Sequence, residues 1–332
     1  MKEHINLLDF LRGFAALGVV VFHFSSPTLP TLYPNYFTNT FFYGQYGVQV
    51  FFVISGFIIP YSMFRGGYQL SSYFRSLGKR FVRICPPSYV SILMSFALYY
   101  AAILLIKRPI SNMLWPDINF TSIIGNLTYT VPYLDTLWFN GVFWTLAIEF
   151  QFYLLIGLLL PLLSRRRVAF TCLALLSLLA LSFIELEWFF RYASFFVLGI
   201  CLFLKKTKLL PLAYIHGLII LSFLCCGYTR GWVELSAGAL AFGLIWVNAN
   251  VNWRWTNFLG KISYSLYITH SVVGFSAEII LKRVSNIHTY PMGKIVMLFV
   301  YTSICIAFAA LFFKLVEQPF IRYSKKIKLI QT

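Results

Sequence analysis

The strongest constraint on the fold is a series of ten apolar runs separated by short polar segments. A helix that crosses a bilayer needs about 20 mainly apolar residues. With 59% hydrophobic and 11% charged residues, the chain is too apolar to cover a water-facing surface. We therefore predict an all-α, polytopic membrane protein with one domain over residues 1–332 and no separate soluble domain. The predicted spans are 7–25, 44–64, 87–106, 141–163, 168–184, 188–204, 209–226, 231–249, 259–281 and 293–316.

The net charge of +17 has a topological explanation. If the N-terminus is cytoplasmic, most of the 27 Lys and Arg residues fall at the cytoplasmic face, and both termini lie inside. This positive-inside pattern makes nucleic-acid binding unnecessary as an explanation of the charge. We expect the basic tail to meet anionic membrane lipids. Its cations are Arg322, Lys325, Lys326 and Lys328.

The six cysteines form no C-x-x-C motif, and almost all of them lie in apolar runs. Closely spaced cysteine pairs are typical of metal sites, and even sets of cysteines in short secreted chains are typical of disulfide frameworks. We therefore expect these thiols to fill the core, and we predict no metal site.

Ionisable side chains inside the spans are functional candidates, because each costs at least about 2.5–3.5 kcal/mol at the bilayer centre. Asp9 and Arg12 are three residues apart, so they could simply neutralise each other within one helix. That pairing would explain why the two charges are tolerated, but not why they are present. The candidates are Asp9, Arg12, His23, Glu149, His270 and Lys314.

Arg12 and His23 lie on one face of the first span, because eleven residues make about three helical turns. Glu149 is eight residues into its own span and should lie about 12 Å below the outer surface, within reach of His23. Two interpretations are open. The carboxylate could orient the imidazole and stabilise its cation, or Glu149 could be protonated and bond a neighbouring helix.

A cationic face precedes the third span, where Arg75, Lys79 and Arg83 are spaced four residues apart and Arg80 is adjacent. These cations could bind lipid headgroups, as is usual for cytoplasmic basic residues. Alternatively, they could form a phosphate clamp, since guanidinium groups bind phosphate bidentately.

Six short motifs give the chain a resemblance to the acyltransferase-3 family of integral membrane acyltransferases. Each motif is weak alone, but their order and their place on the predicted spans match the family nearly end to end. They are Leu8-Asp9-Phe10-Leu11-Arg12-Gly13 leading to His23, Phe51-Phe52-Val53-Ile54-Ser55-Gly56-Phe57, Arg80-Phe81-Val82-Arg83, Phe143-Trp144-Thr145-Leu146-Ala147-Ile148-Glu149, Gly260-Lys261-Ile262-Ser263-Tyr264-Ser265-Leu266-Tyr267 leading to His270, and Val316-Glu317-Gln318-Pro319.

The resemblance implies acyl-CoA chemistry. The family's Arg-x10-His motif falls on Arg12 and His23, and its Arg-x-x-Arg motif falls on Arg80 and Arg83, which are then expected to hold the donor's phosphates. Phe150 departs from the pattern, because many relatives carry a second Glu there. The extracytoplasmic hydrolase-like domain of longer relatives is also missing, so transfer would have to be completed within the membrane part.

In size and overall similarity, the chain resembles the O-antigen O-acetyltransferases of Gram-negative bacteria and their phages. This resemblance implies a multi-pass protein of the bacterial inner membrane that takes acetyl-CoA as its donor. The acceptor would be a lipid-linked or surface glycan, such as the lipopolysaccharide O-antigen repeat. From the family motifs, we expect Trp144, Tyr267 and His270 to contact this acceptor.

The expected mechanism is general-base catalysis by His23, which removes the proton of a sugar hydroxyl or primes an acyl-enzyme step, with Glu149 orienting the imidazole. Arg12, Arg80 and Arg83 would hold the donor. Ser55 is a possible acyl acceptor, although a Ser-Gly pair in a span more often allows close helix packing. The alternative is a transporter or flippase, for which ten spans and buried charges would be equally natural. A third interpretation keeps the enzyme but changes the acceptor to exopolysaccharide or a small molecule.

Overall fold

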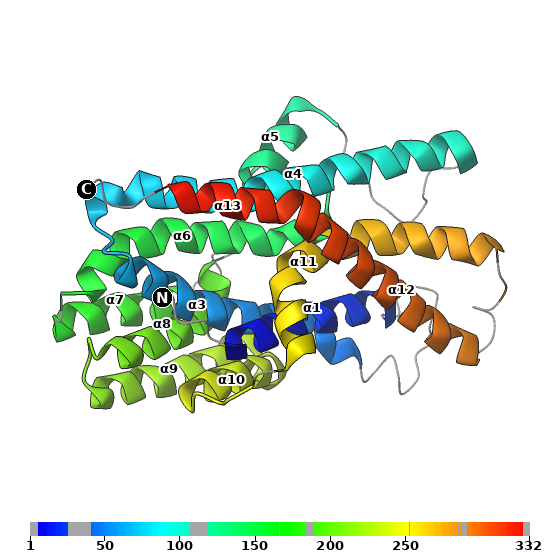
Figure 1. Ribbon diagram of the computed structural model, residues 1–332. Helices are drawn as coiled ribbons and strands as arrows, with labels where there is room; N and C mark the ends of the chain where they lie inside the picture. The colour runs from blue at the N-terminus through cyan, green and yellow to red at the C-terminus, as the bar shows by residue number, and fades with distance from the viewer. Residues whose placement is uncertain are drawn as a thin grey trace.

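Helices form at each of the apolar runs that were predicted to be membrane spans. The computed structural model describes residues 6–25, 41–106, 118–165, 167–183, 189–251, 253–284, 286 and 291–327, and these residues contain no β-strand. Each of the ten predicted runs falls on one helix, which confirms the all-α fold class. The helices of Figure 1 are α1 (Asn6–Ser25), α3 (Gly47–Arg65), α4 (Tyr73–Ile106), α5 (Phe120–Thr128), α6 (Trp144–Leu163), α7 (Val168–Leu181), α8 (Ala193–Thr207), α9 (Leu212–Arg230), α10 (Trp232–Trp246), α11 (Arg254–Val284), α12 (Pro291–Phe312) and α13 (Gln318–Lys326).

Six helical segments within the described ranges are long and apolar enough to cross a membrane. They contain α1, α3, α4, α6, α9 and the continuous unit of α12 and α13. The predicted runs at 168–184 and 231–249 form the shorter apolar helices α7 and α10, of 14 and 15 residues. Helix α8 is also short, and every residue from Ala193 to Leu204 is buried. A helix that is buried all round packs against neighbours on every side.

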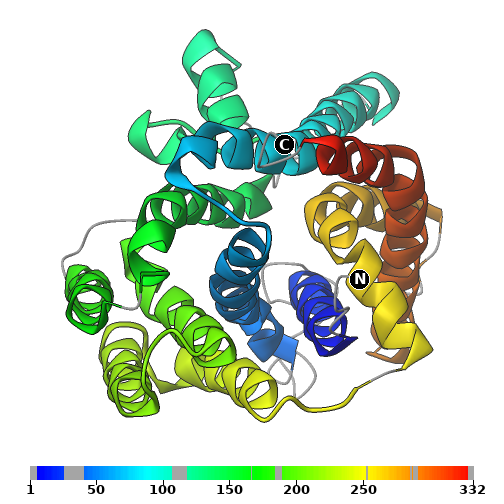
Figure 2. The same ribbon diagram turned by 60° about the vertical axis from the view of Figure 1, so that its left-hand side comes forward.

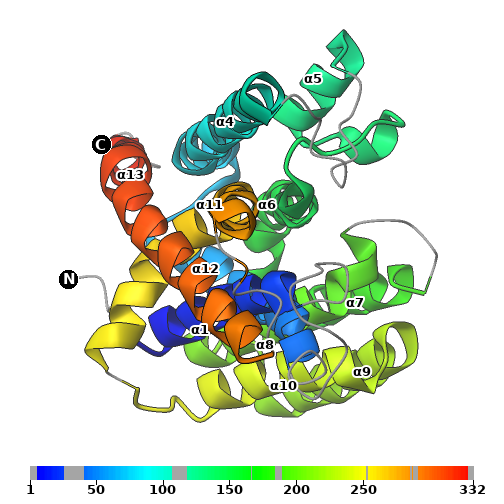
Figure 3. The same ribbon diagram turned by 90° about the vertical axis from the view of Figure 1, so that its right-hand side faces the viewer.

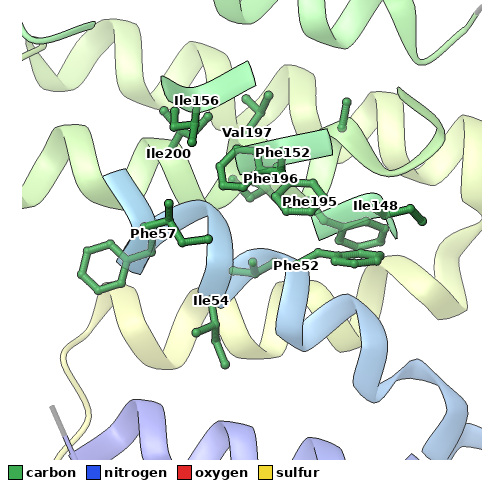
Figure 4. Close-up of a cluster of buried hydrophobic side chains, with 14 of the residues drawn as sticks. Phe52, Ile54, Phe57, Ile148, Phe152, Ile156, Phe195, Phe196, Val197 and Ile200 are labelled. Carbon is green, nitrogen blue, oxygen red and sulfur yellow. The ribbon is translucent and has the colours of Figure 1, made fainter. Parts of the chain in front are cut away.

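Helix α3 lies near the middle of the bundle when it is viewed along the helices (Figure 2). Its apolar side chains interlock with those of α6 and α8 in the cluster of Figure 4. The Phe152 and Phe196 rings are 4.4 Å apart, and Phe52 lies 4.9 Å from Phe196. This aromatic packing fixes the position of α3, which also carries Ser55.

Glycine allows α3 and α8 to approach each other closely. A Cβ atom at Gly56 would lie 2.4 Å from the carbonyl oxygen of Phe196, and one at Gly199 would lie 2.3 Å from that of Val53. The Ser55-Gly56 pair therefore has a packing role, as small residues often do between membrane helices. With Gly56 turned toward α8, the neighbouring Ser55 side chain faces the space between α3 and α6.

A second close approach joins α1 to α11. A Cβ atom at Gly260 would lie 2.3 Å from the carbonyl oxygen of Asp9, and one at Gly13 would lie 2.8 Å from the Gly260 nitrogen. These two helices carry His23 and His270, so their packing determines whether the two imidazoles meet.

We expect Gly260→Leu to destabilise the protein, because its side chain would push the backbones of α1 and α11 apart. Overpacking of a dense core costs about 1–3 kcal/mol, and the clash here is with the main chain. Thermal unfolding in detergent should show a lower Tm. The matched control is Gly217→Leu in α9, where the glycine is exposed and a Cβ atom meets nothing within 4 Å. Equal melting temperatures for the two variants would contradict this packing.

Helix α11 changes direction along its length, and its first part runs steeply across the bundle in Figure 1. The carbonyl oxygen of Ile268 accepts hydrogen bonds from Ser91 Oγ at 2.7 Å and from Asn140 Nδ2 at 2.8 Å. Ser271 Oγ donates to Asn140 Oδ1 at 3.0 Å. Side chains of two other elements thus hold the backbone of α11 immediately next to His270.

The C-terminal part turns from α12 through a π-helix, Phe313–Glu317, into the amphipathic helix α13. Helix α13 packs beside the first part of α4. In Figure 3, α4 and α5 lie on one side of the molecule, and α9 and α10 lie on the opposite side. The end of α3, the start of α4 and the end of α13 share one end of the bundle (Figure 1). This shared end is where the candidate site opens.

Candidate active site

A cavity of about 290 Å³ lies among α1, α3, α4, α6, α11 and α13. It includes the last turns of α3 and the first turns of α4, so it reaches the end of the bundle that these helices share with α13. Its inner walls carry Phe51, Phe52 and Tyr267. The cavity thus combines a polar mouth with a more apolar interior.

All three arginines predicted to hold the donor line this cavity: Arg12, Arg80 and Arg83. Arg80 Nη2 donates to Ser62 Oγ at 3.2 Å, and its guanidinium lies 5.2 Å from the centre of the Tyr153 ring. Stacking and hydrogen bonding hold this guanidinium in place while leaving other N–H donors for a ligand.

Positive charge exceeds negative charge in the cavity lining. The basic residues are Arg12, Lys79, Arg80, Arg83 and Lys325, and the acidic residues are Glu149 and Glu317. Such a walled space attracts an anion more strongly than an open surface would, because its walls exclude water and focus the field. Planar guanidinium groups are well suited to phosphate.

Glu149 faces the cavity, as its place in the family motif suggested, but it does not have the expected partner. Its Oε1 accepts a hydrogen bond of 2.9 Å from Ser55 Oγ. Among the described residues, no hydrogen bond joins Glu149 to His23; the imidazole meets His270 instead. The predicted contact between His23 and Glu149 is therefore replaced by two separate pairs. Depth in the bilayer does not determine which way a side chain points around its helix. The packing of the helices directs Glu149 to Ser55 and His23 to His270.

The two histidines form a pair between α1 and α11. Their ring centres are 4.9 Å apart, and His270 Nε2 lies 3.3 Å from His23 Nδ1. His270 is fully buried, and its Nδ1 lies 2.7 Å from the carbonyl oxygen of Tyr267 and 3.2 Å from that of Leu266. A carbonyl oxygen only accepts, so Nδ1 carries the hydrogen, and Nε2 of the neutral ring is an acceptor.

The tautomer of His23 is also fixed by a backbone carbonyl. Its Nδ1 lies 2.8 Å from the carbonyl oxygen of Val19, so Nδ1–H donates there and toward His270 Nε2. The lone pair of neutral His23 is then on Nε2, for which no partner occurs in the part of the chain that the structure describes. This nitrogen has the protonation state that a general base requires.

Tyr267 separates the cavity from the histidine pair. Its ring lines the cavity, lies 6.0 Å from the His270 ring and contacts Phe51 at 5.8 Å. Its hydroxyl accepts a hydrogen bond of 2.9 Å from Thr145 Oγ1. The cavity therefore ends at Tyr267, and the imidazole pair lies immediately behind it.

The other residues predicted from the sequence lie away from the cavity wall. Trp144, expected to contact the acceptor, packs against Tyr192 with a ring separation of 5.7 Å. Lys314 is exposed on the π-helix. Among the residues that the structure describes, the cavity lining includes Arg12 but not Asp9. Because Arg12 lines the cavity and Asp9 does not, we assign the ligand-facing role to Arg12.

Two charged residues that were not among the predicted site residues also line the cavity. Glu317 is 3% exposed, and its Oε2 accepts a hydrogen bond of 2.5 Å from Ser265 Oγ. Lys325, which was expected to meet lipid, lines the cavity near its mouth. The Glu317 motif was visible in the sequence, but the π-helix that turns it inward was not.

All six cysteines are free thiols. Four lie in the main core and Cys305 in a second cluster, as expected of core-filling residues. Within the described ranges, no group of three or more His, Cys, Asp or Glu side chains is arranged to hold a metal ion.

Comparison with known proteins gives a consistent result. The family model described as "Acyltransferase domain" matches residues 5–314. The O-acetyltransferase OatA of Staphylococcus aureus (strain NCTC 8325 / PS 47) is 28% identical over 172 residues, which is 48% of this chain and 25% of the relative. A protein of S. aureus (strain COL) named as a candidate O-acetyltransferase is 25% identical, over 96% of this chain and 57% of the relative. The chain thus spans a quarter to just over half of the length of these relatives. No solved structure matches it.

Proposed function

Because the chain belongs to the acyltransferase-3 family of membrane proteins, we propose that it transfers an acetyl group from acetyl-CoA to a hydroxyl of a cell-surface glycan. Membrane O-acetylation is the activity that the family and the relatives' names support. The donor, the acceptor and the side of the membrane are our proposal. The observation that carries it is a cavity lined by three arginines that ends one aromatic ring away from a histidine pair.

The donor enters from the end of the bundle where the cavity opens, which we assign to the cytoplasm. Arg80 and Arg83 bind its phosphates, and Arg12 steers the pantetheine arm inward. The arm is mainly neutral and fits the apolar inner wall. The thioester passes the Tyr267 ring to reach His23.

His23 Nε2 is the general base. It takes the proton of the acceptor hydroxyl as the hydroxyl oxygen forms a bond to the acetyl carbon, and the bond from that carbon to sulfur breaks. The proton that His23 accepted then leaves with the CoA thiolate as the free thiol. His270 acts as a positioning residue: its Nε2 accepts from His23 Nδ1–H and stabilises the imidazolium as it forms.

Glu149 opposes the positive charge of the arginines and accepts a hydrogen bond from Ser55 at the cavity wall. Its negative charge offsets part of the repulsion among the three arginines of the lining before the anionic donor arrives.

The proposed acceptor is the O-antigen repeat of lipopolysaccharide, either on its lipid carrier or at the surface, and the proposed location is the bacterial inner membrane with both termini in the cytoplasm. Helix α1 begins and α13 ends toward the same side of Figure 1. That arrangement supports termini on one side of the membrane.

Purified protein in proteoliposomes provides the test. The liposomes receive a lipid-linked glycan acceptor and acetyl-CoA that is labelled either in the acetyl group or in the nucleotide. The acetyl label should appear on the glycan, and the nucleotide label should not. Movement of glycan across the membrane without any acetyl label would instead support a transporter and contradict the proposal.

A further inference from the structure

The amphipathic helix α13 brings its own charges to the mouth of the cavity. Ile321, Ser324 and Lys325 line the cavity, although the basic residues of this segment, Lys325 included, were expected to meet anionic lipids. On the facing helix, α4, the lining residues nearest the mouth are Ser76 and Lys79. Ser324 is 3% exposed and Ser76 is 8% exposed, so both serines are enclosed between the helices.

The two lysines of the mouth belong to one contact between α4 and α13. Lys79 Nζ donates to the carbonyl oxygen of Ile327 at 3.4 Å, which joins the start of α4 to the end of α13. Lys79 is one helical turn, about 6 Å along the axis, nearer the mouth than Arg83. Lys325 is eight residues beyond Glu317, or about 12 Å along α13. Each helix therefore carries a deep charged residue and a lysine closer to solvent.

We propose that Lys79 and Lys325, together with the hydroxyl of Ser76, form a separate binding site for a phosphate monoester, the 3′-phosphate of the acyl-CoA donor. This assignment rests on the proposed function. Along a CoA thioester the order from the acyl group is pantetheine, diphosphate and ribose 3′-phosphate. From the Tyr267 end outward, the cavity presents an apolar wall, the arginines and then the lysines. The two orders match.

Lys325 differs from the adjacent Lys326 in its position relative to the cavity, not in its charge. Lys326 Nζ lies 6.0 Å from the centre of the Tyr323 ring, and the described part of the cavity wall does not include it. Both lysines are exposed at the end of the same helix, so a lipid headgroup could be bound by either one. Of these two lysines, only Lys325 should affect the KM for a donor that carries the 3′-phosphate.

The experiment compares acetyl-CoA with 3′-dephospho-acetyl-CoA as donors for wild type, Lys325→Ala and the control Lys326→Ala. We expect Lys325→Ala to raise the KM for acetyl-CoA by roughly tenfold, as loss of one charge-assisted contact would, without changing kcat. Its KM for the dephosphorylated donor should equal that of wild type, and Lys326→Ala should behave as wild type with both donors. Lys79→Ala should show the same donor dependence as Lys325→Ala.

Three results would overturn the inference: an equal rise in KM with both donors, an equal effect of Lys325→Ala and Lys326→Ala, or no effect of Lys325→Ala. The first two would assign these lysines to lipid headgroups. Failure of the proposed function is visible separately. In that case the wild type itself would transfer acetyl from neither donor, and both proposals would fall.

Discussion

Replacing His23 by Ala is expected to reduce acetyl transfer by about 10²–10⁴-fold, which is the contribution of a positioned general base. His23 Nε2 is the unprotonated nitrogen of the imidazole pair, and its Nδ1–H is directed to the Val19 carbonyl and to His270. Alanine removes the proton acceptor and leaves the donor cavity intact. Initial rates with labelled acetyl-CoA in proteoliposomes measure the effect.

The control for this substitution is His216→Ala. His216 is exposed on α9 and packs on the Trp246 ring at 5.8 Å, away from the cavity. This variant should keep wild-type rates, and both proteins should elute identically on gel filtration. If His23→Ala retained more than a tenth of wild-type activity, a base other than His23 would have to carry the reaction.

The double substitution Arg80→Ala/Arg83→Ala is expected to raise the KM for acetyl-CoA by about 10²–10⁴-fold. A hydrogen bond to a charged group contributes about 1.5–3 kcal/mol, and the two arginines supply at least one each to the phosphates. Both side chains line the cavity, and Arg80 is fixed against Tyr153 and Ser62. Steady-state kinetics over a range of acetyl-CoA concentrations measure the change.

Arg75→Ala is the matched control on the same helix. Its side chain is exposed, and it is absent from the described cavity lining, although the sequence placed it on the same cationic face. We expect its KM to equal that of wild type. An unchanged KM in the double variant would reduce Arg80 and Arg83 to lipid-facing charges.

The sequence predicted the helices well because backbone N–H and C=O groups in lipid must be hydrogen-bonded within the segment, which leaves few alternatives to a helix. All ten apolar runs became helices, including α8, which is enclosed by protein. The lengths of α7 and α10 were less predictable. Apolar composition shows that a segment avoids water, but it does not show whether lipid or another helix takes the place of water.

The sequence predicted many of the residues that form the site, but only some of the contacts between them. Arg12, Arg80, Arg83, Glu149 and Tyr267 do share one cavity. Spacing along a helix gives depth, and depth suggested that Glu149 meets His23. The direction of each side chain depends on packing between helices, which neither hydropathy nor spacing encodes. The close approach of Gly13 and Gly260 brings α11 to α1, and His270 to His23.

The C-terminal contribution was missed for a different physical reason. Glu317 and Lys325 follow the last predicted span, where a basic segment normally meets lipid headgroups. The π-helix Phe313–Glu317 changes the direction in which the following residues point, and no sequence pattern announces such an insertion. As a result, one side of α13 faces the cavity instead of the membrane surface.

A structure of the protein bound to a thioether analogue of acetyl-CoA, which cannot transfer its acyl group, tests the central claim most directly. Our account predicts density for the diphosphate at Arg80 and Arg83, with the pantetheine arm passing Tyr267 and the acyl carbon close to His23 Nε2. Donor density outside the cavity, or a His23 ring turned toward lipid with no path to the arginines, would contradict the account.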